Sequence, residues 1–346
     1  MVKAFVPMLD LKCDDLVRQL VEVLLQAASE SHPVRVLTWM ESIIVTTLVE
    51  LEHDEISPPL LETILERLLP AARDEKPASY NLARKVLQEP AVMEVLAPPL
   101  QSFIQGCLPS GSAHIAEESD LRDEWPDLVL ELADIVPDTL TFVLPQLQEV
   151  VQSDDEHNRE RGTALFARLF AQPGLNLAKR FPHLFKEAFL GKFLDASARV
   201  RTLMIEHGVR LMRVLPAPHA DDLAAEMTKR LMDPDEGVRI AFVRCVCEAC
   251  ADGVGALEPL VRDLGGRLND KKPAVRSAAR AHLCALYRRH FTNEALQWIP
   301  QKLMQTYGHN GAGEVHVGEL RDIEALLHTT LLPHEAEPRL RALLAL

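Results

Sequence analysis

Apolar residues recur every three or four positions along most of this chain, which is the spacing of one buried face on an α-helix. The spacing is interrupted at prolines and short polar runs, so it predicts helices separated by turns. The pattern therefore predicts an all-α protein. The clearest predicted helices cover residues 14–29, 33–51, 59–69, 79–87, 127–135, 140–151, 297–307 and 339–346.

The buried faces of the first two predicted helices can be named from the spacing. In the first helix, one apolar stripe consists of Leu16, Leu20, Val23 and Leu24. In the second helix, another consists of Val36, Trp39, Met40, Ile43 and Ile44. Because two such helices would pack stripe against stripe, we expect all of these side chains to be buried.

One short phrase occurs three times in the second half of the chain. In each copy an aspartate stands six residues before an arginine, and a valine immediately precedes that arginine. The arginines at 201, 239 and 276 are 38 and then 37 residues apart. A period of about 40 residues with two helices per unit is typical of HEAT repeats. The pairs are Asp195 with Arg201, Asp233 with Arg239, and Asp270 with Arg276.

The phrase predicts how the chain is organised. A single helix pair cannot cover an apolar stripe alone, so the repeats must stack. Such stripes resume after the second and third copies and consist of Val238, Ala241, Phe242, Cys245, Val246 and Ala249 in one repeat and Val275, Ala278, Ala279, Leu283 and Leu286 in the next. We predict a HEAT-type α-α superhelix in which residues 1–346 form one continuous solenoid, with the clearest repeats over 184–290. A weaker copy lies near residue 155, where Arg161 follows Asp155 by six residues without the valine.

Two further segments carry predictions about the boundaries of the array. Residues 109–120 contain Ser, Gly and acidic residues without an apolar stripe, which indicates an exposed loop. The last predicted helix has an apolar stripe and no polar outer face, although a solenoid is expected to end in a polar unit. This ending indicates a fragment of a longer array.

The phrase residues are expected to form a structural ladder. Each turn aspartate can cap the helix that follows, with its negative charge at the positive end of that helix. Each arginine can hydrogen-bond the aspartate of its own or the next repeat. Repeated ligand sites are the alternative interpretation. The proposed ladder consists of Asp195, Arg201, Asp233, Arg239 and Asp270.

Composition and charge narrow the functional classes. Apolar residues make up 47% of the chain and aromatic residues only 5%, which suits helices packed through Leu, Val and Ala. Residues 1–160 hold 11 Lys or Arg against 30 Asp or Glu, a net charge of −19. Residues 161–346 hold 26 against 21, a net charge of +5. The strongly acidic first half argues against general DNA binding. It is better suited to binding basic proteins or to keeping the protein soluble.

The six cysteines do not form a disulfide framework in a chain of this length, so a reducing compartment is expected. The N-terminus has no secretory signal pattern, and no run of eighteen apolar residues occurs. We therefore expect an intracellular protein. Cys245, Cys247 and Cys250 are close in sequence, but zinc would need four converging ligands, so small buried residues are the preferred interpretation and a metal site the alternative.

Several stretches, taken in their order, resemble one family. These are ILERLLP at 64–70, NLARKVL at 81–87, FLGKF at 189–193, ALYRRH at 285–290, WIPQKL at 298–303 and LPH at 332–334. Together they resemble the cohesin-associated family named for precocious dissociation of sister chromatids, from about residue 20 to the last residue. Members of that family are longer than this chain at both ends.

The resemblance implies a nuclear, chromatin-associated and non-enzymatic regulator. Such proteins bind the kleisin subunit of the cohesin ring and the releasing factor Wapl, and they control sister chromatid cohesion and cohesin release. Association with chromatin is expected to run through cohesin rather than through direct DNA binding. The resemblance also implies that inositol hexakisphosphate can bind, while no cofactor is required.

A basic group is the best candidate for contact with a partner. Arg276 and Arg280 are four residues apart, so they share one face of a helix. Charges of one sign repel unless an anion lies between them, so a polyphosphate or an acidic peptide segment is expected there. A solvated face is the alternative. The group consists of Lys271, Lys272, Arg276, Arg280, Arg288 and Arg289.

No residue is predicted to be catalytic. His207 and His282 occupy the same place in their repeats, and neither is paired with a Ser or Cys nucleophile. Two alternatives stay open. One is a HEAT scaffold for another nuclear client, of the transport receptor or phosphatase type. The other is a HEAT-like DNA glycosylase, which would need a basic concave surface and is disfavoured by the acidic first half.

Overall fold

The computed structural model describes most of the chain as helices and turns. The described residues contain no strand, which confirms the predicted all-α class. No helix among them has the length and apolar character needed to cross a membrane. The predicted loop over 109–120 lies outside the described residues. The structure describes residues 14–29, 32–51, 55–107, 121, 123–310, 317–326, 329, 331–332 and 334–345.

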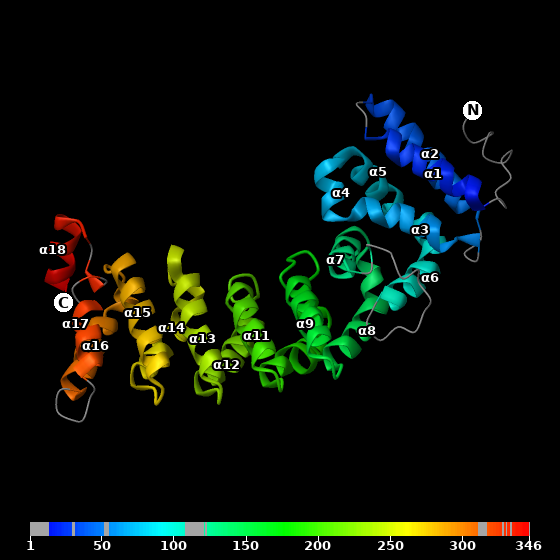
Figure 1. Ribbon diagram of the computed structural model, residues 1–346. Helices are drawn as coiled ribbons and strands as arrows, with labels where there is room; N and C mark the ends of the chain where they lie inside the picture. The colour runs from blue at the N-terminus through cyan, green and yellow to red at the C-terminus, as the bar shows by residue number, and fades with distance from the viewer. Residues whose placement is uncertain are drawn as a thin grey trace. The chain divides into compact units, whose positions relative to one another are not determined.

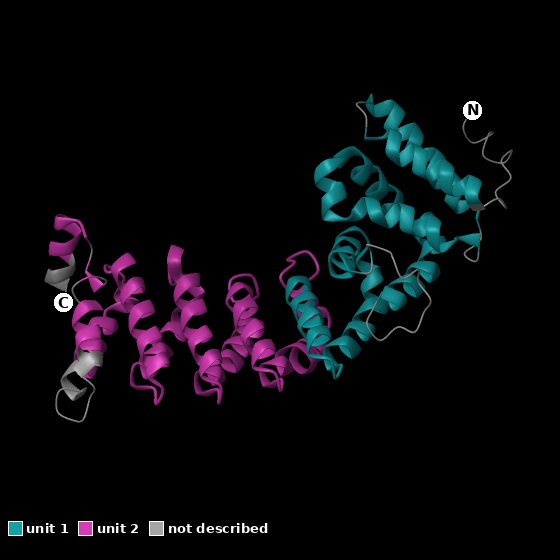
Figure 2. Cartoon of the chain, in the orientation of Figure 1, with its two compact units in different colours: residues 1–169 teal, residues 170–346 magenta. Residues whose placement is uncertain are grey.

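The chain divides into two compact units, residues 1–169 and 170–346 (Figure 2). Within unit 1, α1 packs against α2, α3 and α5, and α6 packs against α8 (Figure 1). That all residues form one continuous solenoid stays a prediction. The helices of unit 1 are α1 (Asp14–Ala27), α2 (Val34–Val49), α3 (Pro58–Leu65), α4 (Pro70–Glu75), α5 (Pro77–Gln88), α6 (Pro90–Cys107), α7 (Trp125–Ile135), α8 (Leu140–Gln152) and α9 (Glu156–Phe170), the last ending where unit 2 begins.

Prolines begin several helices of unit 1 instead of only ending them. Pro70 and Pro90 stand at the first positions of α4 and α6, two helices that the apolar spacing did not predict. A proline fits there because its missing amide would have no partner in the first turn. α6 also continues through Pro98 and Pro99. The sequence signal failed because internal prolines normally indicate a helix end.

The buried face of α1 includes Leu24 of the predicted stripe but otherwise lies beside that stripe. Val17 and Val21 are buried, whereas Leu16 is 40% exposed and Val23 is 61% exposed. In α2, Trp39 is 49% exposed. The prediction of burial is wrong for Leu16, Val23 and Trp39, and it is confirmed for Leu24, Met40, Ile43 and Ile44. Adjacent stripes on α1 are both apolar, so spacing alone could not select the one that meets its neighbours.

Unit 2 consists of stacked helix pairs. The second helices of successive repeats, α11, α13 and α15, lie side by side in one layer (Figure 1). The first helices form another layer, in which α12 contacts α14. The helices of unit 2 are α10 (Leu177–Arg180), α11 (Ala198–Leu211), α12 (Ala217–Lys229), α13 (Glu236–Ala249), α14 (Glu258–Asp263), α15 (Pro273–Arg289), α16 (Trp298–Asn310), α17 (Val317–Leu326) and α18 (Ala336–Ala345).

Each clean phrase begins at the end of a 3-10 turn. These turns are Leu190–Leu194, Arg230–Met232 and Leu264–Asn269, and a phrase aspartate with extended backbone follows each of them. The second helix then starts within three residues and buries the predicted stripe against its neighbours. Val238, Phe242, Val275 and Leu283 all have no exposed surface, which confirms the stripes of the second and third repeats.

Candidate partner-binding surface

The arginine of one repeat binds the aspartate of the next repeat. Nε and Nη2 of Arg201 donate to the two carboxylate oxygens of Asp233, both at 2.9 Å. Arg239 makes the same two bonds to Asp270 at 3.0 Å. Nη1 of Arg201 turns back to its own repeat and donates to the carbonyl of Asp195 at 2.8 Å. Consecutive repeats are therefore joined by bidentate ion pairs, the strongest geometry for this kind of contact.

The carboxylate of Asp233 accepts hydrogen bonds from several donors. Its side chain is fully buried and also accepts from Arg230 at 2.9 Å and from the amide of Asp235 at 3.0 Å. Burial disfavours the charged carboxylate, but the hydrogen bonds from Arg201 and from the Asp235 amide outweigh it. The pKa of Asp233 therefore lies below its ordinary value, and the pKa of Asp270 is lowered by the same balance.

The expectation that Asp233 and Asp270 cap the following helix is wrong. The carboxylate of Asp235 caps α13 and accepts from the amide of Val238 at 3.1 Å. The residue before α15 is Lys272, and its side chain forms no cap. Asp233 and Asp270 each accept a hydrogen bond from the backbone amide two residues later in the chain. Both carboxylates also accept hydrogen bonds from an arginine of the preceding repeat. Asp233 and Asp270 therefore join neighbouring repeats instead of capping a helix.

The weaker copy near residue 155 has a different register from the one predicted. Nη1 of Arg159 donates to the carbonyls of Ser153 at 3.0 Å and Asp154 at 2.8 Å, which is the contact that arginines make in the clean repeats. Arg161 instead lies over the ring of Trp125, 5.7 Å from its centroid. The predicted role of Arg161 is therefore wrong. A serine takes the aspartate position, which hid the match.

The predicted basic group does not form one surface. Arg280 is only 2% exposed, so a partner cannot reach it, and the expectation that it shares an exposed face with Arg276 is wrong. Nη1 of Arg276 donates to the carbonyl of Asp270 at 2.7 Å. Arg288 and Arg289 stand at the opposite end of α15, about 20 Å away at 1.5 Å per residue.

The exposed part of the basic group is therefore small. Lys271 and Lys272 stand in the turn before α15, and Nζ of Lys272 lies 3.8 Å from a carboxylate oxygen of Glu236. A hexakisphosphate would need several cations that converge on one anion. The six residues of this group do not converge in that way, so they do not fit such a ligand. Whether the chain binds inositol hexakisphosphate elsewhere stays a prediction from the resemblance.

The three clustered cysteines are all buried. Burial raises the pKa of Cys245 and of Cys250 to about 11, and it raises the pKa of Cys247 as well. Across the described ranges, no three His, Cys, Asp or Glu side chains are grouped as metal ligands. A neutral, buried thiol is a weak nucleophile, so these residues act as small apolar side chains at neutral pH.

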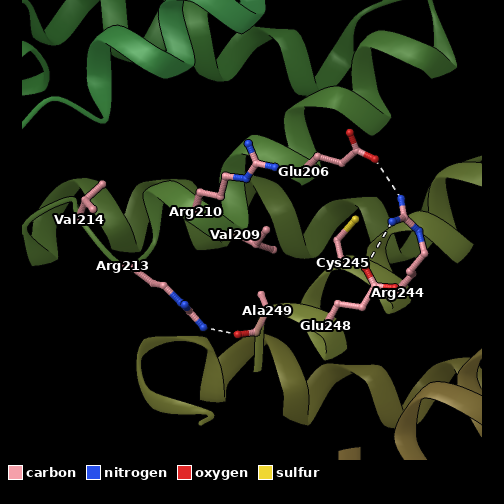
Figure 3. A pocket seen from close by; sticks show the side chains of 9 residues that line it. All are labelled: Glu206, Val209, Arg210, Arg213, Val214, Arg244, Cys245, Glu248 and Ala249. Atoms are coloured by element: carbon pink, nitrogen blue, oxygen red, sulfur yellow. Dashed lines mark hydrogen bonds and ion pairs between the residues drawn. The ribbon is translucent and has the colours of Figure 1, made fainter. Parts of the chain in front are cut away.

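A groove that the sequence did not indicate lies along α11 and α13 and has a volume of about 500 Å³ (Figure 3). It combines an apolar floor with charged walls. The floor carries Val209, Val214, Cys245 and Ala249, and the walls carry Glu206, Arg210, Arg213, Arg244 and Glu248.

Most charges in the groove are already paired (Figure 3). Arg244 donates to Glu206 at 2.9 Å and to Glu248 at 3.4 Å, and Arg213 donates to the carbonyl of Ala249. Arg210 is exposed, and none of the described residues forms a hydrogen bond or ion pair with its guanidinium. The groove therefore presents one open cation beside an apolar floor.

A signal for this groove does exist in the sequence. Glu206 and Arg244 each stand five residues after a ladder arginine, Arg201 and Arg239 respectively. Equivalent positions of stacked repeats face each other, so opposite charges there predict an ion pair between α11 and α13. Reading each position across repeats, rather than along one helix, would have found this pair.

Comparison with known proteins gives a consistent result along the whole chain. A family model described as sister chromatid cohesion protein PDS5 matches residues 1–346. The chain is 27% identical to PDS5 homolog A of Gallus gallus over 342 residues, which are 96% of this chain and 25% of that protein. It is 26% identical to PDS5 homolog B of Homo sapiens over 333 residues, which are 94% of this chain and 22% of that protein. The chain thus spans about a quarter of the length of these relatives.

A plant relative and a solved structure agree with this result. PDS5 homolog A of Arabidopsis thaliana is 26% identical over 313 residues, which are 88% of this chain and 19% of that protein. A chain solved in the Pds5–Scc1 complex matches with a TM-score of 0.75 at 18% identity, covering 96% of this chain and 53% of that chain. At this identity the similarity establishes the fold, and it confirms the predicted HEAT-repeat solenoid.

Proposed function

Because this chain belongs to the family of the sister chromatid cohesion protein PDS5, we propose that it is a non-enzymatic regulator of cohesin. The observation that carries the proposal is the family match over all 346 residues. In this proposal the chain binds an extended segment of the kleisin subunit. The Pds5 chain that shares its fold was solved in complex with Scc1, which supports a kleisin as the partner.

The architecture of unit 2 suits an extended ligand. Successive repeats present α11, α13 and α15 in series, so a peptide crossing them would meet a new set of side chains at each step. Ion pairs between repeats hold these helices in register, because the Arg201–Asp233 and Arg239–Asp270 contacts each join two repeats. A rigid surface of this kind lowers the entropic cost of binding a flexible segment.

The proposal extends to the wider role of the family. We expect the chain to dock the releasing factor Wapl, to affect sister chromatid cohesion and cohesin release, and to act on chromatin in the nucleus. These expectations come from the family to which the chain belongs. They concern the activity of a longer protein, of which this chain matches about a quarter.

Binding to kleisin can be measured directly. A fluorescently labelled kleisin segment from the region after its N-terminal domain is titrated with the purified chain, and a scrambled peptide of the same composition is the control. Saturable binding at micromolar concentration or tighter, with none to the scrambled peptide, is the expected result. The absence of binding by a chain that shows helical circular dichroism and cooperative unfolding would overturn the proposal for this chain.

A charge-reversal variant tests whether the exposed basic turn takes part. Lys271→Glu combined with Lys272→Glu changes two exposed side chains and leaves the buried Arg280 untouched. If an acidic part of the kleisin lies on this turn, the double variant should bind it at least about tenfold more weakly. Unchanged affinity would place the contact elsewhere on the chain.

A further inference from the structure

We propose that the groove along α11 and α13 binds a peptide segment in which an acidic side chain stands next to an aliphatic one. The acidic group would pair with Arg210, and the aliphatic group would lie on the floor beside Val214 (Figure 3). The inference stands apart from the proposed kleisin binding, because it rests only on the chemistry of this groove.

The acidic preference follows from how the charges are shared. Of the three arginines in the groove, Arg244 is held between two carboxylates and Arg213 is held on the carbonyl of Ala249. Arg210 is exposed and has no such partner among the described residues. A carboxylate that arrives from solvent can therefore pair with Arg210 without breaking an existing ion pair. A guanidinium and a carboxylate form one of the strongest hydrogen-bonded pairs in proteins.

The aliphatic preference follows from the floor. Val214 is 49% exposed, so it offers apolar surface that a ligand can remove from water. Val209 and Ala249 continue this surface along the groove. The thiol of Cys245 belongs to it as well, because burial raises its pKa to about 11 and keeps it neutral at physiological pH. The floor therefore favours the binding of an apolar side chain and contains no reactive nucleophile.

Other ligand classes fit the groove less well. A nucleic acid or a polyphosphate needs several open cations, whereas this groove has one, and the carboxylates of Glu206 and Glu248 would repel a dense negative charge. A small free anion would leave the apolar floor in water. The volume of about 500 Å³ lies in the range of pockets that hold a small ligand, which is enough for a few side chains of a peptide.

Selection from random peptides tests the proposal, because such a library offers the groove acidic, basic and apolar side chains in every combination. The purified chain selects from a library of short peptides displayed on phage, alongside the variants Arg210→Glu and Arg289→Glu. Arg289 is an exposed arginine at the end of α15 and lies outside the groove, so its variant is the matched control. Circular dichroism confirms that each variant is folded.

The expected result is a reversal of charge preference. The unmodified chain and Arg289→Glu should enrich peptides with Asp or Glu next to Leu, Ile, Val or Met. The best peptide, made synthetically, should bind Arg210→Glu at least about tenfold more weakly, and selection on that variant should favour Lys or Arg instead. Val214→Asp should weaken the same peptide by removing apolar surface.

Three results would overturn the proposal. One is selection of the same acidic peptides by Arg210→Glu with equal affinity. Another is enrichment of peptides without any acidic residue by the unmodified chain. The third is the absence of any enrichment by the folded, unmodified chain, since an accessible groove of this chemistry must select at least a weak binder.

Discussion

Replacing Asp233 with alanine removes the residue on which the contact between two repeats converges. Its carboxylate accepts two hydrogen bonds from Arg201, one from Arg230 and one from the amide of Asp235. Arg201 is only 8% exposed, so the variant leaves a buried guanidinium whose remaining partners are backbone carbonyls, including that of Asp195. The change therefore creates an uncompensated buried charge as well as lost hydrogen bonds.

The expected loss of stability can be compared with that of a matched control, Asp235→Ala, two residues away. Breaking a buried ion pair by removing one partner costs about 3–5 kcal/mol, because the remaining charge stays desolvated. Asp235→Ala removes only the cap of α13, which costs about 1 kcal/mol. We therefore expect Asp233→Ala to lower the free energy of unfolding by about 3–5 kcal/mol, several times the effect of Asp235→Ala.

Urea unfolding followed by far-ultraviolet circular dichroism measures both variants. Stacked repeats can unfold in stages, so amide hydrogen exchange should accompany the titration and show where protection is lost. We expect Asp233→Ala to reduce protection in both α11 and α13, since the residue joins the two repeats. The effect of Asp235→Ala should be confined to the first turn of α13.

One result would refute this reasoning. If Asp233→Ala proves no less stable than Asp235→Ala, the buried ion pair contributes no more than a cap. A further variant distinguishes the stabilisation by the ion pair from the cost of leaving a buried charge unpaired. Arg201→Met combined with Asp233→Leu removes both charges of the pair between repeats, and it should recover part of the lost stability because apolar side chains can replace a buried ion pair at little cost. The recovery is only partial because Arg230 also loses the carboxylate of Asp233. A double variant less stable than Asp233→Ala would contradict that account.

Three other predictions concern the pH dependence of the ladder, the packing of α9 and the reactivity of Cys245. The pKa values of Asp233 and Asp270 are lowered in the folded state, so their contribution to stability is complete above about pH 4 and is lost as the pH falls through the folded pKa. The urea concentration at the unfolding midpoint should therefore fall as the pH is lowered below about 4, and it should fall less steeply in Asp233→Asn. An equal pH dependence in the two proteins would contradict the contribution assigned to Asp233. In Gly162→Ala the new Cβ would lie 2.8 Å from Cγ1 of Val151. The resulting overpacking should destabilise the chain by about 1–3 kcal/mol, more than the stabilisation of about 1 kcal/mol from the higher helix propensity of alanine. Thermal unfolding should begin at a lower temperature in this variant, and a higher midpoint would show that α8 and α9 adjust freely. Cys245 is buried with a pKa of about 11, so mass spectrometry should find iodoacetamide labelling far slower in the folded chain than in urea, and similar rates would show that the thiol is accessible.

The repeat architecture was readable from the sequence because it depends on periodicity. Val238, Phe242 and Leu283 recur at helical spacing within a unit, and the units recur every 37 or 38 residues. Local spacing determines which face of a helix is apolar, and the proline that follows Asp233 determines where one helix ends and the next begins. The choice between adjacent apolar stripes on α1 was beyond such spacing, because it depends on which neighbours pack there.

The candidate site depended much more on contacts between repeats. The positions of Arg201 and Arg239 after their aspartates were visible in the sequence, but spacing does not say which aspartate each arginine meets. The basic group had the opposite problem. Four-residue spacing placed Arg276 and Arg280 on one helix face, yet spacing carries no information about burial, and the packing around α15 covers Arg280.

By itself, then, the sequence determined the helical class, the repeat length, the stripes of the clean repeats and the family resemblance, since each of these is a local or periodic property. Only the tertiary structure decided that Arg201 reaches into the next repeat and that Arg280 is inaccessible. It also decided that Arg210 stands open beside an apolar floor. These features arise where side chains from helices about 38 residues apart meet, and pairwise distances of that kind are fixed by how the repeats stack.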